Sequence, residues 1–149
     1  AFNRLGWRLK IIGDGPERRR LLRMARRNIE FLGNQSDEDL RGYYSKCRAL
    51  IFPQEEDFGI VALEAMASGR PVIAYRAGGA LEIIKEGLTG LFFDAQLPES
   101  LMQCLKRFNY RDFNNNAIKK YILDFDKEIF KEKIKRFVEE KYEEFLKCR

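Results

Sequence analysis

Short apolar segments alternate with helical patterns over most of this chain, and that alternation restricts its fold more than any other feature of the sequence. The apolar segments are rich in Ile, Leu, Val and Phe and lie next to Gly or Pro, as buried strands do. They cover residues 8–12, 29–32, 49–52, 71–75 and 89–93. Strands that alternate with helices pair in parallel, and helices cover both faces of such a sheet. The sequence therefore predicts an α/β fold, a doubly wound Rossmann-like parallel sheet.

The predicted helices occupy the segments between these strands and the C-terminal part of the chain. Pro16 suits the first turn of a helix over 17–27, and Ser36 or Asp37 caps a helix that runs to about Lys46. Further helices are expected over 60–68, which Gly69 ends at the C′ position, over 81–86, and from Pro98 onward.

The last segment, 126–149, has apolar residues at intervals of three, four and one. This pattern predicts an amphipathic helix that requires a packing partner. That partner could be the rest of the chain, an absent domain or a second copy. We expect residues 1–149 to form a single domain that includes this helix.

Composition removes several functional classes. The 149 residues include no histidine, which excludes every catalytic triad, zinc site or proton shuttle that needs one. The three cysteines are widely spaced and form no CxxC motif. A disulfide framework or a metal site is therefore not expected, and a reducing cytoplasm is the natural setting. No apolar run approaches the roughly 18 residues that a membrane span needs.

The net charge is +5, and the densest basic stretch lies within the predicted helix 17–27. Arginine occupies positions 18, 19, 20, 23, 26 and 27 of the chain. No aromatic residue is interleaved there to stack on bases, so nucleic-acid binding is not expected. A solvated helix face explains the pattern, and a face toward an anionic membrane or an acidic partner is the alternative.

Ligands of a doubly wound sheet bind outside the carboxyl ends of its strands, so the loops that follow the strands are the candidate sites. Gly13-Asp14-Gly15 follows the first strand, an acidic loop from Gln54 to Gly59 follows the third, and Arg76-Ala77-Gly78-Gly79 follows the fourth. The first loop lacks the third glycine of a dinucleotide fingerprint, because Arg18 stands there, and no P-loop is present. On its own, that first loop is a plain turn.

The acidic loop carries more chemistry. Glu56 precedes a helix N-terminus, whose free amides and dipole attract phosphate oxygens, and Gly59 leaves that backbone open to close approach. Glu64 stands in an apolar helix, where a carboxylate requires a partner. Since carboxylates accept hydrogen bonds from sugar hydroxyls, the combination suits a nucleotide-sugar. The alternative is that the acidic loop only complements the helix dipole and that Glu64 is a surface residue.

The stretch from Glu56 to Ala74 resembles the E-x7-E signature of the retaining glycosyltransferases of family 4, which have the GT-B fold. Satellite motifs follow in the family's order: Gly13-Asp14-Gly15-Pro16, Phe31-Leu32-Gly33, Phe52-Pro53, Gly78-Gly79-Ala80-Leu81-Glu82 and Gly87-Leu88-Thr89-Gly90. The resemblance covers most of the chain. It implies the C-terminal, donor-binding domain of a two-domain enzyme that transfers a hexose from a UDP- or GDP-linked sugar to a glycan or lipid-linked acceptor.

The resemblance also implies roles for individual residues. Glu56 would be catalytic, contacting hydroxyls of the donor sugar near the reacting carbon, and Glu64 would accept hydrogen bonds from the ribose hydroxyls. Other residues of the donor site would act mainly through their backbone: Phe58, Gly59, Ile60 and Val61 toward the sugar and diphosphate, Gly13 and Gln35 beside the base, and Gly78 and Gly79 in the same cleft. No metal and no cofactor are implied, since the nucleotide-sugar is itself a substrate.

This sequence departs from the family at its start. Those enzymes supply an Arg and a Lys, which pair with the diphosphate, from a segment upstream of the first strand predicted here. The same segment carries a strand that lies centrally in the sheet. Because the sequence opens at Ala1, we expect a piece of a longer protein that lacks the acceptor-binding N-terminal domain and is inactive alone.

Retention of configuration implies one of two routes. A covalent intermediate needs a carboxylate on the far side of the sugar, for which Glu56 is the candidate. We favour the other route, front-face departure of the nucleoside diphosphate.

Two other functions stay open. The chain could be a non-catalytic nucleotide-sugar-binding module, or a basic domain that binds a membrane surface or a protein partner. Lipopolysaccharide, capsule or glycolipid synthesis would fit the family, and a peripheral membrane contact from the cytoplasm would fit the basic helix.

Overall fold

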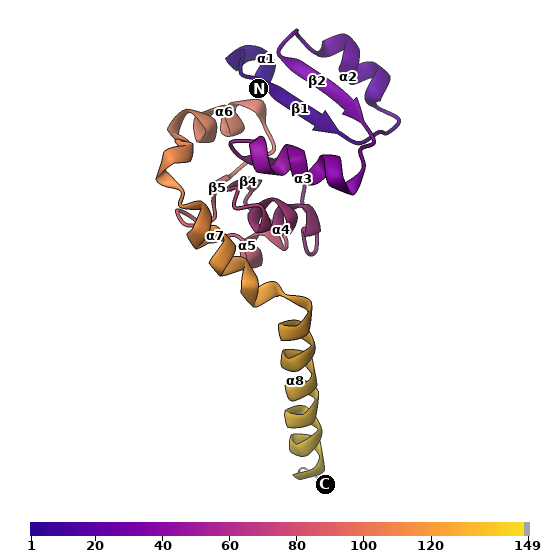
Figure 1. Cartoon of the computed structure of the whole chain (residues 1–149), viewed down its shortest axis with the longest axis vertical. Coiled ribbons are helices and arrows are strands. Elements are labelled where there is room, and N and C mark those ends of the chain that lie inside the picture. The colour runs from indigo at the N-terminus through magenta and orange to yellow at the C-terminus, as the bar shows by residue number, and fades with distance from the viewer. Residues whose placement is uncertain (148–149) are drawn as a thin grey trace.

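The computed structural model describes residues 1–147 and arranges them in the predicted alternation (Figure 1). The strands are β1 (Leu9–Ile12), β2 (Ile29–Gly33), β3 (Leu50–Phe52), β4 (Val72–Tyr75) and β5 (Gly90–Phe93). The α-helices are α1 (Phe2–Leu5), α2 (Arg18–Met24), α3 (Asp37–Lys46), α4 (Ile60–Ala67), α5 (Ala80–Ile83), α6 (Pro98–Arg107), α7 (Asn115–Ile122) and α8 (Lys127–Lys147). Short 3-10 helices, η1 (Tyr110–Asp112) and η2 (Leu123–Phe125), flank α7. The strand pairs are parallel, which confirms the predicted α/β class.

The strands form two ladders in place of one continuous sheet. β1 pairs with β2, and β3, β4 and β5 follow one another in a second sheet. Leu9 donates its amide to Asn28, just before β2, at 3.0 Å, so the backbone groups of Lys10 point to the opposite edge of β1. Leu50 likewise donates to Pro71 at 3.0 Å, so the backbone of Ile51 points away from β4. The family resemblance places a further strand centrally in the sheet, and the interruption between the two ladders is compatible with that expectation.

Helices join the two ladders on one face. Phe2 of α1 and Leu105 of α6 share a buried cluster with Ile73 of β4 and Phe93 of β5. Leu9 of β1 packs against the same cluster. One apolar layer therefore extends across both sheets.

Helix α3 makes the corresponding connection on the other face. Val72 and Ala74 belong to a second core that α4 and α7 cover, because successive strand residues point to opposite faces. Tyr44 of α3 packs against this core. The Lys10 ammonium of β1 lies 5.2 Å from the centroid of the neighbouring Tyr43 ring. The expected covering of both faces by helices is confirmed.

Local signals account for most of the element boundaries. The Ser36 hydroxyl caps α3 by accepting the Asp39 amide at 3.1 Å, and Gly69 follows α4 with φ of +74°. Helix α2 is shorter than predicted, because the chain turns extended at Ala25 and Pro16 lies before the helix. Helix α5 also stops early, at Ile83, since Ile84 is extended.

Helix α8 projects from the body of the molecule (Figure 1). Ile129 is half-buried, whereas the apolar residues from Phe130 to Leu146 are exposed, from 45% of the residue surface at Ile134 to 62% at Tyr142. The predicted helix 126–149 is thus present over its described residues, and beyond Ile129 most of its apolar face is exposed. Cys148 and Arg149 lie outside the described residues.

Two further findings concern the described residues alone. Cys47 and Cys104 are free thiols. None of the described helices combines the length and apolar character that crossing a membrane requires.

Candidate functional site

The acidic loop after β3 and the glycine turn after β4 meet at the carboxyl ends of these strands. The Gly79 amide donates to the carbonyl oxygen of Glu56 at 2.7 Å. A Cβ on Gly78 would lie 2.5 Å from the same oxygen, so the backbone of the glycine turn packs directly against the backbone at Glu56 and leaves no room for a side chain. The structure therefore brings Glu56, Phe58, Gly78 and Gly79 together, as the sequence predicted.

Helix α4 begins at this junction with its first amides unused. Gly59 is buried and has φ of +87°, a left-handed conformation that glycine adopts without strain, and no side chain caps the helix. The first bonds of the helix run from Ala62 and Leu63 to the Gly59 carbonyl at 3.0 and 3.3 Å. The amides of Ile60 and Val61 precede them and find no acceptor in the described structure. Such a helix start can bind an anion.

The Glu56 carboxylate is exposed beside this helix start. Its Oε1 accepts one hydrogen bond, from Gln54 Nε2 at 2.9 Å. Within residues 1–147, no ion pair forms at Glu55, Glu56 or Asp57, and none of these side chains caps α4. The acidic side chains therefore do not cap α4, and any interaction that they have with the helix dipole acts through space.

Glu64, on α4, has the partner that the apolar sequence around it required. Tyr44 of α3 donates its hydroxyl to Glu64 Oε2 at 2.9 Å. Glu64 is exposed, so it is a surface residue as the alternative held, but one with a fixed hydrogen bond. Partial burial, followed by the hydrogen bond to Glu64 and the charge of that carboxylate, raises the pKa of Tyr44.

This contact predicts a dependence of stability on pH. An unfolded tyrosine ionises near pH 10, whereas folded Tyr44 keeps its proton there, so the folded state loses stability as pH rises above about 10. We expect the free energy of unfolding of Tyr44→Phe to fall less steeply than that of the native chain between pH 9 and 11. Denaturant unfolding at a series of pH values measures the slope.

The control for this experiment is Tyr110→Phe. Arg111 lowers the pKa of Tyr110, so removing the Tyr110 hydroxyl is not expected to flatten the dependence of the free energy of unfolding on pH. Equal slopes for Tyr44→Phe and the native chain would show that the Tyr44–Glu64 contact does not form in solution.

Gly13 and Gln35 lie in the other ladder, at the ends of β1 and β2. The Gly13 amide donates to Gly33 at 2.8 Å, and Gln35 Nε2 donates to the carbonyls of Leu32 at 2.8 Å and Asn34 at 3.1 Å. These bonds hold the two turns locally. In the described structure neither residue bonds to the acidic loop, and both lie at the ends of the β1–β2 ladder, whereas Glu56, Gly78 and Gly79 follow strands of the other ladder.

A groove of about 560 Å³ borders the site between α4 and the start of α8. Ile60, Leu63 and Glu64 form its α4 side, and Lys119 and Lys127 lie among the residues opposite. Glu56 and the glycine turn are outside it. Glu64 thus faces both Tyr44 and a groove with cationic side chains, while Glu56 faces open solvent.

Tyr44 and Arg76 are residues of the site region to which the sequence alone gave no role. Tyr44 lies in the predicted helix that runs to about Lys46, and nothing local indicates that its hydroxyl reaches Glu64. Arg76 carried a usable signal, because it directly follows β4 as Asp94 directly follows β5. Adjacent parallel strands bring such residues side by side. Across residues 1–147, no cluster of three or more His, Cys, Asp or Glu side chains could hold a metal ion.

Parallel strands with helices on both faces, and an open helix start at their carboxyl ends, define this chain as a Rossmann-like domain. The family described as "Glycosyl transferases group 1" matches residues 1–108. The chain belongs to that family.

Individual relatives agree with this assignment. An uncharacterized glycosyltransferase of Methanocaldococcus jannaschii is 33% identical over 136 residues, which are 88% of this chain and 38% of the relative. A GDP-mannose-dependent alpha-mannosyltransferase of Corynebacterium glutamicum is 41% identical over 87 residues, 58% of this chain and 21% of that protein. The structure of a sucrose-phosphate synthase from Thermosynechococcus elongatus superposes with a TM-score of 0.78 at 25% identity, over 91% of this chain and 38% of that one. The chain thus spans about two fifths or less of each of these proteins.

Proposed function

We propose that this chain is the donor-binding domain of a retaining glycosyltransferase that takes a hexose from a UDP- or GDP-linked sugar. The observation that carries the proposal is the uncapped start of α4, with Glu56 on one side and Glu64 one turn along the helix. Free amides suit a diphosphate, and two carboxylates suit the hydroxyls of a ribose and a sugar. Glu56 would then contact the sugar and Glu64 the ribose.

The reaction we propose is front-face transfer. The bond from the anomeric carbon to the diphosphate oxygen breaks, and the acceptor hydroxyl oxygen bonds to the anomeric carbon on the same face while its proton passes to the departing diphosphate oxygen. The amides of Ile60 and Val61 would stabilise the charge that develops on the departing diphosphate. The donor preference is proposed from a relative: since the corynebacterial protein is named for GDP-mannose, a GDP-linked hexose is the first donor to test.

The acceptor would be a glycan or a lipid-linked sugar bound by other parts of a longer protein. Support for this comes from coverage, because the chain accounts for 38% of the length of its archaeal relative. We therefore expect donor binding, without transfer, from residues 1–149.

The test is calorimetric or NMR titration of the chain with UDP, GDP, UDP-glucose and GDP-mannose, up to millimolar ligand. We expect saturable binding of one nucleotide and its sugar conjugate. Glu64→Gln should weaken that binding about tenfold or more, because it removes a charged acceptor from the ribose. Glu132→Gln on α8 is the matched control: it removes the same charge from a glutamate with no ion pair in the described structure and should bind like the native chain.

The outcomes separate the proposal from its alternatives. No binding of any nucleotide would overturn it. Binding that Glu64→Gln and Glu132→Gln reduce equally would place the nucleotide elsewhere on the chain.

One observation favours a second function, contact with an anionic membrane surface. No residue of α2 is buried, and Leu22 and Met24 are 42% and 57% exposed among arginines. Arg19 and Arg23 form no ion pair within the described residues. Absence of nucleotide affinity, together with binding to anionic vesicles that weakens with salt, would favour this function over the first.

A further inference from the structure

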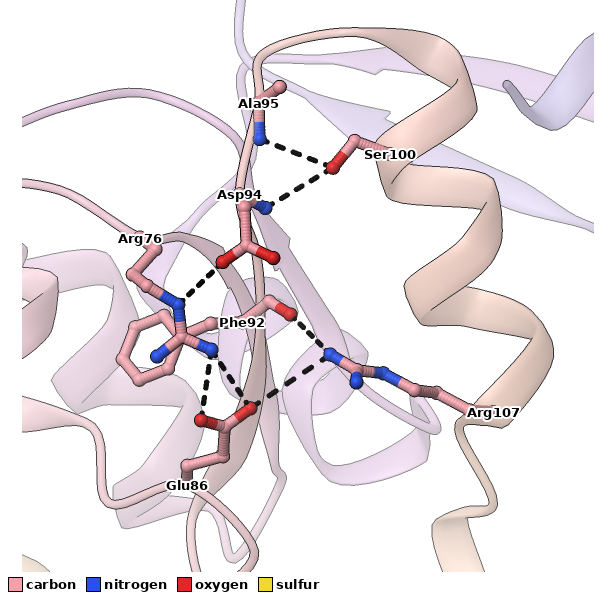
Figure 2. Close-up of polar contacts among 7 residues, drawn as sticks. All are labelled: Arg76, Glu86, Phe92, Asp94, Ala95, Ser100 and Arg107. Atoms are coloured by element: carbon pink, nitrogen blue, oxygen red, sulfur yellow. Dashed lines mark hydrogen bonds and ion pairs between the residues drawn. The ribbon is translucent and has the colours of Figure 1, made fainter.

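Arg76 is the centre of a polar cluster at the outer edge of the three-stranded sheet (Figure 2). It directly follows β4, and its Nε donates to Asp94 Oδ1, directly after β5, at 2.6 Å. Its Nη2 donates to both carboxylate oxygens of Glu86, at 2.9 and 3.2 Å. The guanidinium lies over the Phe92 ring, 4.6 Å from its centroid. Two carboxylates and a ring thus hold one side chain in a single orientation.

The backbone of Arg76 starts the turn that holds the acidic loop. The Arg76 amide donates to Phe93 at 3.0 Å, which extends the ladder by one bond, and the Ala77 amide donates to Tyr75 at 2.9 Å. Two residues later, the Gly79 amide donates to Glu56. A short, hydrogen-bonded turn therefore connects the backbone of Arg76 to the loop that carries Glu56, so the position of that loop depends on how Arg76 is held.

A second set of hydrogen bonds connects the loop after β5 to the acidic loop after β3. Asp94 and Ala95 both donate their amides to the Ser100 hydroxyl, at 3.2 Å each, which orders the loop after β5. From that loop, Gln96 Nε2 donates to the Pro53 carbonyl at 2.9 Å, at the base of the acidic loop. The loops after β3, β4 and β5 are joined in a ring, and the bond between Arg76 and Asp94 is one of its links.

The geometry points to Arg76 as a positioning residue of the donor site, acting through Gly79 on the backbone around Glu56. This inference rests on the proposed function. Arg76 itself need not touch the donor. Its planar guanidinium can bond to two carboxylates and stack on a ring at once, whereas a lysine ammonium cannot reproduce that arrangement.

The role predicts a selective effect on the sugar part of the donor. Arg76→Lys keeps the positive charge but cannot bond to Asp94 and Glu86 at the same time in the same geometry. The loop around Glu56 should therefore move, while the Tyr44–Glu64 contact should stay. We expect about a fivefold loss of affinity for the nucleotide-sugar, comparable to one hydrogen bond. Affinity for the free nucleotide should change less than twofold. Asp94→Asn should act in the same direction, which guards against a folding failure of one variant.

Arg107→Lys is the matched control. Arg107 shares the cluster, since its Nη2 donates to the Phe92 carbonyl at 2.8 Å and lies 3.9 Å from Glu86 Oε1, but in the described structure no hydrogen bond or ion pair joins its side chain to residues 76–79. A purely structural cluster predicts similar losses of thermal stability and no selective change in binding for both arginine variants. A positioning role predicts the selective change for Arg76→Lys alone.

A ligand-free measurement separates this inference from the proposed function. Backbone amide NMR shifts over residues 55–60 should change in Arg76→Lys and stay unchanged in Arg107→Lys. Unchanged shifts in Arg76→Lys would overturn the positioning role even if the native chain binds a nucleotide-sugar. If the native chain binds no nucleotide-sugar but these shifts move, the proposed function fails while the coupling of Arg76 to the loop holds.

Discussion

Phe52→Ala is expected to lower the free energy of unfolding by about 4 kcal/mol. Phe52 ends β3 and is 1% exposed, within the core that also contains Met66 and Ile83. Its ring lies 3.2 Å from where a Cβ of Gly59 would stand, so it supports the residue that starts α4. Removing the ring leaves a cavity beneath the donor site, and denaturant unfolding followed by circular dichroism would measure the loss.

Phe58→Ala is the control for this substitution. Phe58 lies six positions further along and is 53% exposed, so its truncation should change stability by no more than about 0.5 kcal/mol. Under the proposed function, Phe58→Ala should instead weaken nucleotide-sugar binding modestly. Equal destabilisation by the two substitutions would contradict the assignment of one phenylalanine to the core and the other to the surface.

The fold class followed from the sequence because strand signals are local. The segment around β4 is apolar, begins after a proline and ends before a glycine turn, and β4 forms at 72–75 within the predicted 71–75. The end of α4 was equally predictable, because Gly69 takes the positive φ that a helix C′ position often requires. The loops that follow parallel strands line one edge of the sheet, so Glu56 could also be expected near Gly78 and Gly79 from the order of the strands.

The sequence alone did not predict that the strands form two separate ladders. The β1 segment has the composition of a central strand whether or not a neighbour fills its second edge. The same limit applies to α2, whose Leu21 and Leu22 have a helical pattern but stay exposed. Gly13 and Gln35 were assigned to the site by resemblance, and their placement relative to Glu56 depends on how the two ladders are joined.

The contact between Tyr44 and Glu64 is another feature that local sequence patterns did not predict. Tyr44 and Glu64 are 20 residues apart, and the bond between them depends on how α3 packs against α4. The pairing of Arg76 with Asp94 had a sequence signal, because each directly follows one of two strands, but it also depends on the register of β4 and β5, which is set by apolar packing elsewhere in the strands. Local sequence patterns identify the candidate polar side chains, and the packing of helices and strands determines which of them form hydrogen bonds.

Gly79→Ala should destabilise the chain by about 3 kcal/mol and reduce nucleotide-sugar binding more than tenfold. The reason is contact alone, because Gly79 has φ of −60°, a conformation open to any residue. A Cβ there would lie 2.7 Å from the carbonyl carbon of Asp57 and 2.9 Å from the Cα of Phe58, and closer still to the Asp57 carbonyl oxygen. All three atoms are backbone, so the acidic loop must move away and take Glu56 and the start of α4 with it.

Gly42→Ala provides the matched glycine control. Gly42 lies within α3, and a Cβ there would meet no atom within 4 Å. Alanine should therefore stabilise that helix by up to about 1 kcal/mol, and donor binding should not change. Thermal unfolding and nucleotide-sugar titration of both variants test the comparison directly. A Gly79→Ala chain as stable as the native one would mean that the turn and the acidic loop are not in contact, and the argument that ties Arg76 to Glu56 would fail with it.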